Sequence, residues 1–175
     1  MKKSVFIFTC IFTFLTGFAQ TSPTPKYDIP AEYSFLLPED YDKYNTQIKE
    51  AIDWYLWRSM GMDNDKRQNA ATFFMQWLVG SPTVAVEIDT KVVNFVNSNP
   101  QLLLPFSMGW SKYAIENEDA NRIKACAAGI EAAVAYYNKN RAFMNKDAGI
   151  EKYEKMIKNK KLENYISKNL PAKKE

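Results

Sequence analysis

The sequence predicts an all-α protein, a single helical bundle of about six or seven helices around a central alanine-rich helix. Apolar residues recur at helical spacing through most of the chain, and the connections between these stretches are short and polar. Only residues 84–88 alternate between apolar and other side chains as a strand does, and a lone strand would have no partner. Together these observations favour helices packed on helices.

The central helix is expected at residues 119–141. Apolar residues recur along one face every three or four positions: Ile123, Ala127, Ile130, Val134 and Tyr137. Small residues line its other side, where a surface helix would carry charges: Ala125, Ala128, Gly129, Ala132 and Ala135. Because small residues on several faces let neighbouring helices approach closely, we interpret this stretch as the centre of the bundle.

The first nineteen residues have the order of a secretory signal peptide. Lys2 and Lys3 precede an apolar run at residues 5–18, and small residues stand at the −3 and −1 positions of a cut after Ala19. The run is shorter than the roughly 20 apolar residues of a transmembrane helix, and an uncleaved N-terminal anchor is the alternative. We expect export, to the periplasm or outside the cell, after cleavage near Ala19, with no stable membrane span afterwards.

Four segments follow from this pattern. Residues 1–19 are the signal peptide, 20–37 an extended proline-rich leader, 38–170 the helical domain and 171–175 a charged C-terminal tail. A chain of this length is expected to form one domain.

The first helix is expected to begin at Pro38 and to end at Gly61, with acids in its first turn. Its apolar face carries Tyr41, Tyr44, Ile48, Ile52 and Tyr55. The second helix is expected at about residues 65–79, with the stretch 63–65 as its N-terminal cap. That stretch resembles the start of a calcium loop, but Gln68 and Phe74 stand where such a loop needs its glycine and closing glutamate.

Residues 82–96 fit two patterns. Val84, Val86 and Ile88 alternate like a strand, whereas the helical spacing that starts at Val84 continues to Val96, so a helix is predicted.

The next helix begins at Asn99-Pro100, with Pro105 as a kink or a restart and Gly109 as a close-contact point. After the central helix, a shorter helix begins near Asp147 and a last one carries Leu162, Tyr165 and Ile166.

Charge and residue types exclude several function classes. Without Lys2 and Lys3 the chain has 21 basic and 20 acidic residues, which gives no electrostatic reason to expect a nucleic-acid partner. The sequence has no histidine, and export would leave Cys126 as its single cysteine, so no metal site, cofactor or histidine-based catalytic arrangement is expected. Cys126 is interpreted as a buried, inert side chain; a reactive thiol or an intermolecular disulfide is the alternative.

The charges are unevenly distributed along the chain. Residues 28–53 carry a net charge of −5 and residues 151–175 a net charge of +4. The first and last helices are interpreted as neighbours, or as simply solvated. The alternative is a basic tail that touches an anionic surface or partner.

Two carboxylates are weak catalytic candidates. Glu131 lies among alanines on the central helix, where partial burial would raise its pKa, as in a general acid. Pairing with Lys124 or with a basic residue of a neighbouring helix is the alternative. Glu87, between Val86 and Ile88, is the second candidate.

The chain has more aromatic residues than one buried face per helix requires, so some are expected to line a concave surface. The candidate ligand-binding residues are Trp54, Trp57, Trp77, Trp110 and Tyr136. Ordinary core filling is the alternative. The sequence thus favours an exported soluble helical domain without enzymatic activity that binds a protein partner or a small apolar or aromatic ligand. The alternatives are a carboxylate-dependent hydrolase and an inhibitor or immunity-type protein.

Overall fold

The computed structural model describes residues 23–118 and 120–171. These residues form seven α-helices and no strand, which confirms the all-α prediction. The helices are α1 (Pro38–Lys43), α2 (Asn45–Trp57), α3 (Asn64–Gly80), α4 (Leu103–Glu116), α5 (Arg122–Lys139), α6 (Ala148–Lys158) and α7 (Leu162–Asn169). Three short 3₁₀ helices, η1 (Asn94–Asn97), η2 (Pro100–Leu102) and η3 (Arg141–Phe143), lie in the connections. The predicted signal peptide and most of the predicted tail lie outside the described residues.

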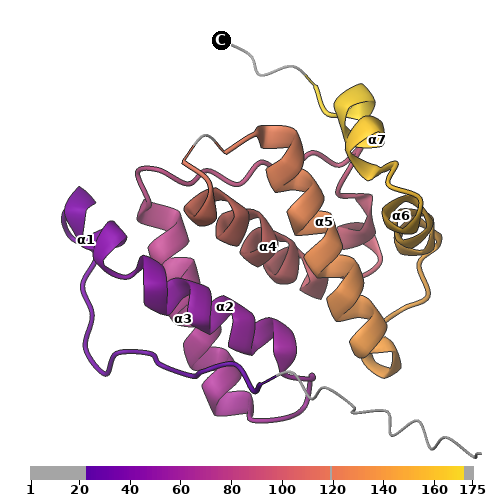
Figure 1. Ribbon diagram of the computed structural model, residues 1–175. Coiled ribbons are helices and arrows are strands. Elements are labelled where there is room, and N and C mark those ends of the chain that lie inside the picture. The colour runs from indigo at the N-terminus through magenta and orange to yellow at the C-terminus, as the bar shows by residue number, and fades with distance from the viewer. Residues whose placement is uncertain (1–22, 119, 172–175) are drawn as a thin grey trace, which may run out of the picture.

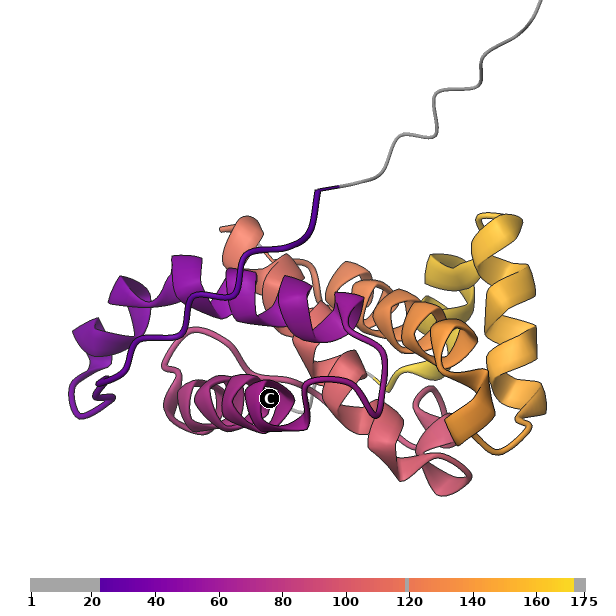
Figure 2. The same ribbon diagram turned by 90° about the horizontal axis from the view of Figure 1, so that it is seen from below.

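The helix α5 lies at the centre of the bundle, as its alanine-rich sequence predicts. It packs against α4 along its length and also contacts α2, α6 and α7. Figures 1 and 2 show α1, α2 and α3 on one side of the α4–α5 pair and α6 and α7 on the other.

Small residues set the close approach of α4 and α5. A Cβ atom on Gly109 of α4 would lie 2.5 Å from the Cβ atom of Ala132, and one on Gly129 of α5 would lie 2.8 Å from the Phe106 ring. Neither position has room for a larger side chain, which confirms Gly109 as a close-contact point.

The predicted first helix is divided, and α2 ends at Trp57 rather than at Gly61. Tyr44 lies at the break between α1 and α2, where its ring packs against Phe35 of the leader and Phe73 of α3. These aromatic contacts hold the chain in a turn that a continuous helix would not allow.

Residues 23–37 form an extended segment along α2 and α3, as Figure 2 shows. The ring of Tyr27 meets that of Trp54 edge to face at 4.7 Å between centroids, and Tyr33 meets Phe73 in the same way at the same distance.

The helix predicted at residues 82–96 is wrong, because residues 84–89 run as an extended stretch between bends and turns, and only η1 is helical. β-Branched residues are frequent here, and they lower helix propensity by restricting the χ1 angle. Local bonds replace the helical ones. The Ser81 hydroxyl accepts from the Val84 N–H at 3.2 Å, and the Asp89 backbone carbonyl accepts from the N–H groups of Val92 and Val93.

The start of α6 agrees with the sequence, and the starts of α5 and α3 differ from it. Asp147 caps α6 as expected, whereas α5 begins at Arg122, three residues after the predicted start at residue 119, with Asn121 as its cap. Asp63 occupies the N-cap position of α3, but its side chain caps no N–H group there. Its carboxylate instead pairs with Arg58 at 2.5 Å, so the predicted side-chain cap is wrong.

The acidic first helices and the basic last helices are not neighbours, because α1 and α2 lie across the α4–α5 pair from α6 and α7. The interpretation of these helices as neighbours is therefore wrong, and their being simply solvated stays a prediction. Among the described residues, none of the helices combines the length and the apolar character needed to cross a membrane.

Candidate functional site

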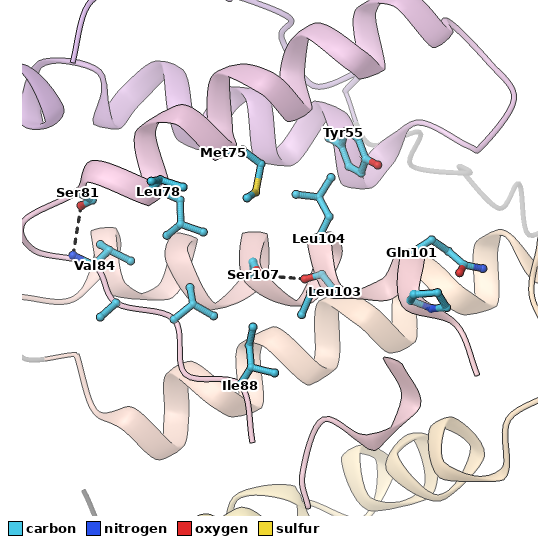
Figure 3. A pocket seen from close by; sticks show the side chains of 14 residues that line it. Tyr55, Met75, Leu78, Ser81, Val84, Ile88, Gln101, Leu103, Leu104 and Ser107 are labelled. Carbon is cyan, nitrogen blue, oxygen red and sulfur yellow. Dashed lines mark hydrogen bonds between the residues drawn. The ribbon is translucent and has the colours of Figure 1, made fainter. Parts of the chain in front are cut away.

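The candidate site is an apolar groove of about 750 Å³, which we call the α3–α4 groove (Figure 3). The end of α3, the extended segment 81–88 and the beginning of α4 form its walls, and Tyr55 is contributed by α2. Its lining residues are Tyr55, Met75, Leu78, Val79, Ser81, Val84, Ala85, Val86, Ile88, Pro100, Gln101, Leu103, Leu104 and Ser107.

The groove walls follow from local sequence spacing. Met75, Leu78 and Val79 stand at positions i, i+3 and i+4 of α3, so they share one face of the helix. Figure 3 shows Met75 and Leu78 facing Leu104 of α4 across the hollow. In the extended segment, Val84, Ala85, Val86 and Ile88 line the wall, and Val84 and Ala85 also border a small hollow beside Trp110.

No charged residue lines the groove, and its two serine hydroxyls bond to the protein's own backbone. The Ser81 hydroxyl accepts from the Val84 N–H, and the Ser107 hydroxyl donates to the Leu103 carbonyl at 3.0 Å. The side-chain amide of Gln101 donates to the Met144 sulfur at 3.1 Å. The surface offered to a ligand is therefore mostly hydrocarbon.

Three of the large apolar side chains in the groove remain in water. Met75 is 42% exposed, Val79 82% and Ile88 53%. Met75 and Val79 also line a second hollow of about 510 Å³, formed with the leader and α1. The exposed end of α3 thus forms an apolar ridge between two hollows, and contiguous exposed apolar surface of this kind is typical of interaction sites.

The tryptophans and the tyrosine predicted to bind ligand do not line the groove. Trp54, Trp77, Trp110 and Tyr136 are buried in the core, and Trp57 is 39% exposed. Trp110 borders only a small hollow of about 250 Å³. The structure places four of these five aromatic residues where core filling would place them.

The two candidate carboxylates lie apart from the groove and from each other. Glu87 pairs with Arg122, whose Nη2 lies 2.6 Å from its carboxylate. Glu131 lies nine residues beyond Arg122 on α5, a rise of about 13 Å along the helix. Glu131 is exposed and forms no ion pair with any described residue, Lys124 included. Partial desolvation, with a smaller contribution from Glu163, raises its pKa.

Cys126 is fully buried in α5. Burial raises the pKa of its thiol to about 12, so the reactive thiolate is scarce at neutral pH. In residues 23–118 and 120–171, no three cysteine, aspartate or glutamate side chains gather closely enough to hold a metal ion.

No family model, curated protein or solved structure matches this chain. The α3–α4 groove and the residues around it therefore carry the functional argument.

Sequence reasoning missed the groove because its residues come from α2, α3, η2, α4 and the segment 81–88, and that segment was predicted as a helix. Two signals pointed to it. Val79 lies next to Leu78 at the end of α3 and outside the buried face that holds Phe74 and Trp77. The alternation at residues 84–88, read as an extended segment, would have produced an apolar edge with nothing to cover it.

Proposed function

We propose that this protein is an exported binding protein without enzymatic activity, and that the α3–α4 groove takes an uncharged, apolar ligand. The observation that carries the proposal is a charge-free lining with large apolar side chains left in water. Burying such surface stabilises a complex by about 25 cal/mol per Å². The groove volume of about 750 Å³ lies within the usual range for ligand sites, roughly 300–1,000 Å³.

The absence of charged residues from the groove lining favours an uncharged ligand. A charged group that entered this hydrocarbon surface would lose its water without gaining a partner, because no lining residue is charged. The proposal that the protein is exported is supported by the signal-peptide order of residues 1–19.

The test is binding of Nile red, an uncharged apolar dye whose fluorescence rises on leaving water. We expect the purified protein to bind the dye with a blue-shifted emission. Val79→Lys and Ile88→Lys place a charge at exposed positions of the groove, so each should lower dye affinity about tenfold or more without unfolding the domain.

Met62→Lys is the matched control, because Met62 is 49% exposed and does not line the groove. It should leave dye binding unchanged. Equal dye affinity in all three variants, or no dye binding by the unsubstituted protein, would refute the proposal.

A further inference from the structure

The extended segment beside the groove has unused backbone hydrogen-bonding groups. From Ala85 to Ile88, none of the backbone N–H or C=O groups bonds to another described residue. Ala85 and Ile88 are exposed, and Val86 and Glu87 are half-buried, so water reaches this segment. Extended backbone with free N–H and C=O groups is the template on which another strand pairs.

Contacts at both ends and in the middle hold the segment in this extended conformation. The Ser81 hydroxyl bonds to the Val84 N–H before it, and the turn closed by the Asp89 carbonyl follows it. Between them, the Glu87 carboxylate accepts from Arg122 Nε at 2.6 Å, and Arg122 also donates to the Pro171 carbonyl. A strand fixed in advance has less conformational entropy to lose when a partner pairs with it.

The apolar side chains of the groove and the unpaired backbone groups of residues 85–88 are together complementary to one class of ligand. Val84, Ala85, Val86 and Ile88 add apolar side chains to the groove. Glu87 does not line it and lies in the small hollow with Trp110 and Arg122, which Val84 and Ala85 also border. An occupant that used both the groove and the free backbone would supply apolar side chains at alternate positions and its own N–H and C=O groups. It would carry no charge on the side that enters the groove.

We infer that the occupant of the α3–α4 groove is an extended, uncharged peptide segment that pairs with the backbone of residues 85–88. This inference rests on the proposed function and names its ligand class. The peptide adds a strand beside the segment, its alternate side chains enter the groove, and its backbone supplies the missing hydrogen bonds.

The experiment begins with a phage-displayed library of random octapeptides, selected on the immobilised full chain as it is purified after export. We expect enriched peptides with apolar residues at alternate positions and no charge among them. A synthetic enriched peptide, acetylated and amidated at its ends, should displace Nile red. It should also slow hydrogen exchange at residues 85–88, whose N–H groups have no partner among the described residues and should exchange fast in the free protein.

N-methylation of the peptide tests backbone pairing directly. Successive residues of a strand direct their N–H groups to opposite edges, so methylating alternate residues removes the donors of one edge and keeps the side chains. We expect one of the two alternating methylation patterns to lower affinity about tenfold or more and the other to have little effect. Equal effects of both patterns would overturn the inference.

Proline substitution tests the protein side. Ala85→Pro and Val86→Pro each remove an N–H group that has no partner among the described residues, so neither breaks a bond of the fold. One of the two should weaken the peptide about tenfold, and this loss should exceed any loss of Nile red affinity in the same variant, because the dye forms no strand-like backbone pairing. Val86→Ala is the matched control, because it trims the side chain but keeps the N–H group.

The outcomes separate this inference from the proposed function. If the protein binds Nile red but enriches no peptide, the peptide inference fails and the apolar-ligand function stands. If the protein binds no Nile red, the proposed function itself fails. A dimer in sedimentation whose dissociation restores Nile red binding would identify a second copy as the occupant and overturn the inference.

Discussion

Arg67 of α3 donates a hydrogen bond from Nη2 to the hydroxyl of Tyr136 on α5, across the core of the bundle, at 2.5 Å. The Arg67 guanidinium is buried and has no carboxylate partner among the described residues, and it lies 4.2 Å from the Tyr55 ring centroid. Its Nη1 donates to the Arg58 carbonyl at the end of α2, where Lys139 also donates to two carbonyls. The negative end of α2 and the aromatic rings thus take the place of an acidic counter-ion.

Replacing this guanidinium should destabilise the fold. Arg67→Met removes two hydrogen bonds from a charged donor and leaves their acceptors buried, so we expect a loss of about 2 kcal/mol in the free energy of unfolding. Arg67→Lys should recover only part of this lost stability, because an ammonium group cannot reproduce the planar arrangement of guanidinium N–H donors. Urea unfolding measures both. Arg141→Met, at an exposed position, is the control and should change stability by less than about 0.5 kcal/mol. An unchanged unfolding midpoint in Arg67→Met would contradict the assigned role.

The α4–α5 interface predicts an inverted response to alanine. Glycine to alanine within an exposed helix normally stabilises by about 1 kcal/mol. At Gly109 the added Cβ atom would lie 2.6 Å from the Ala128 carbonyl oxygen, so we expect Gly109→Ala to destabilise by about 1–3 kcal/mol. Thermal unfolding of Gly109→Ala and Gly129→Ala checks the sign. A raised melting temperature in either variant would show that the helices can separate at little cost.

The buried thiol predicts a dependence of stability on pH. The pKa of Cys126 is raised to about 12 in the folded protein, above its ordinary value near 9.0. The contribution to stability is therefore complete below about pH 8.5 and is lost as pH rises, because only the unfolded chain loses the proton there. We expect iodoacetamide to leave Cys126 unlabelled in the native protein at pH 8 and to label it in urea. Rapid labelling of the native protein would contradict this.

Glu131 predicts a second dependence of stability on pH, in the range where carboxylates titrate. Its pKa is raised by partial desolvation and by Glu163, so its charged form is the less favoured one in the folded state. The ionised Glu131 carboxylate therefore lowers the stability of the folded state. This loss is absent at low pH, where the group is protonated, and appears as pH rises through the carboxylate range. Glu131→Gln should stabilise the protein slightly near pH 7, by at most about 0.5 kcal/mol because the side chain is exposed, and not near pH 3. In a Glu163→Gln background the gain should shrink; an equal gain at both pH values would contradict this explanation.

The parts of the fold set by local sequence could be predicted. The period of apolar residues identified α3, α5, α6 and α7, and the small residues of α5 identified its central place. The break at Tyr44 and the extended segment 81–90 could not be predicted, because distant contacts decide them. Tyr44 is held by Phe35 and Phe73, and residues 84–88 have two periodicities that only the surrounding helices distinguish.

The candidate site was harder to predict than the fold. An excess of aromatic residues indicated a binding surface, but rings such as Trp77 and Trp110 fill the core, and the apolar hollow is made by aliphatic side chains. The groove needs Met75, Val86 and Leu104 to meet from three elements. The spacing of residues within one element cannot predict that residues of separate elements will lie side by side.

The separation of charge across the bundle gives the molecule an electric dipole moment along its length. Lysines of α6, α7 and their connection lie at one end and the acids around α1 and α2 at the other, although residues 20–175 together carry a net charge of only +1. Residues 28–53 carry a net charge of −5 and residues 148–169 a net charge of +3, so the two ends differ in sign although the whole is nearly neutral. At low ionic strength, cation and anion exchangers would both retain it, each by a different end.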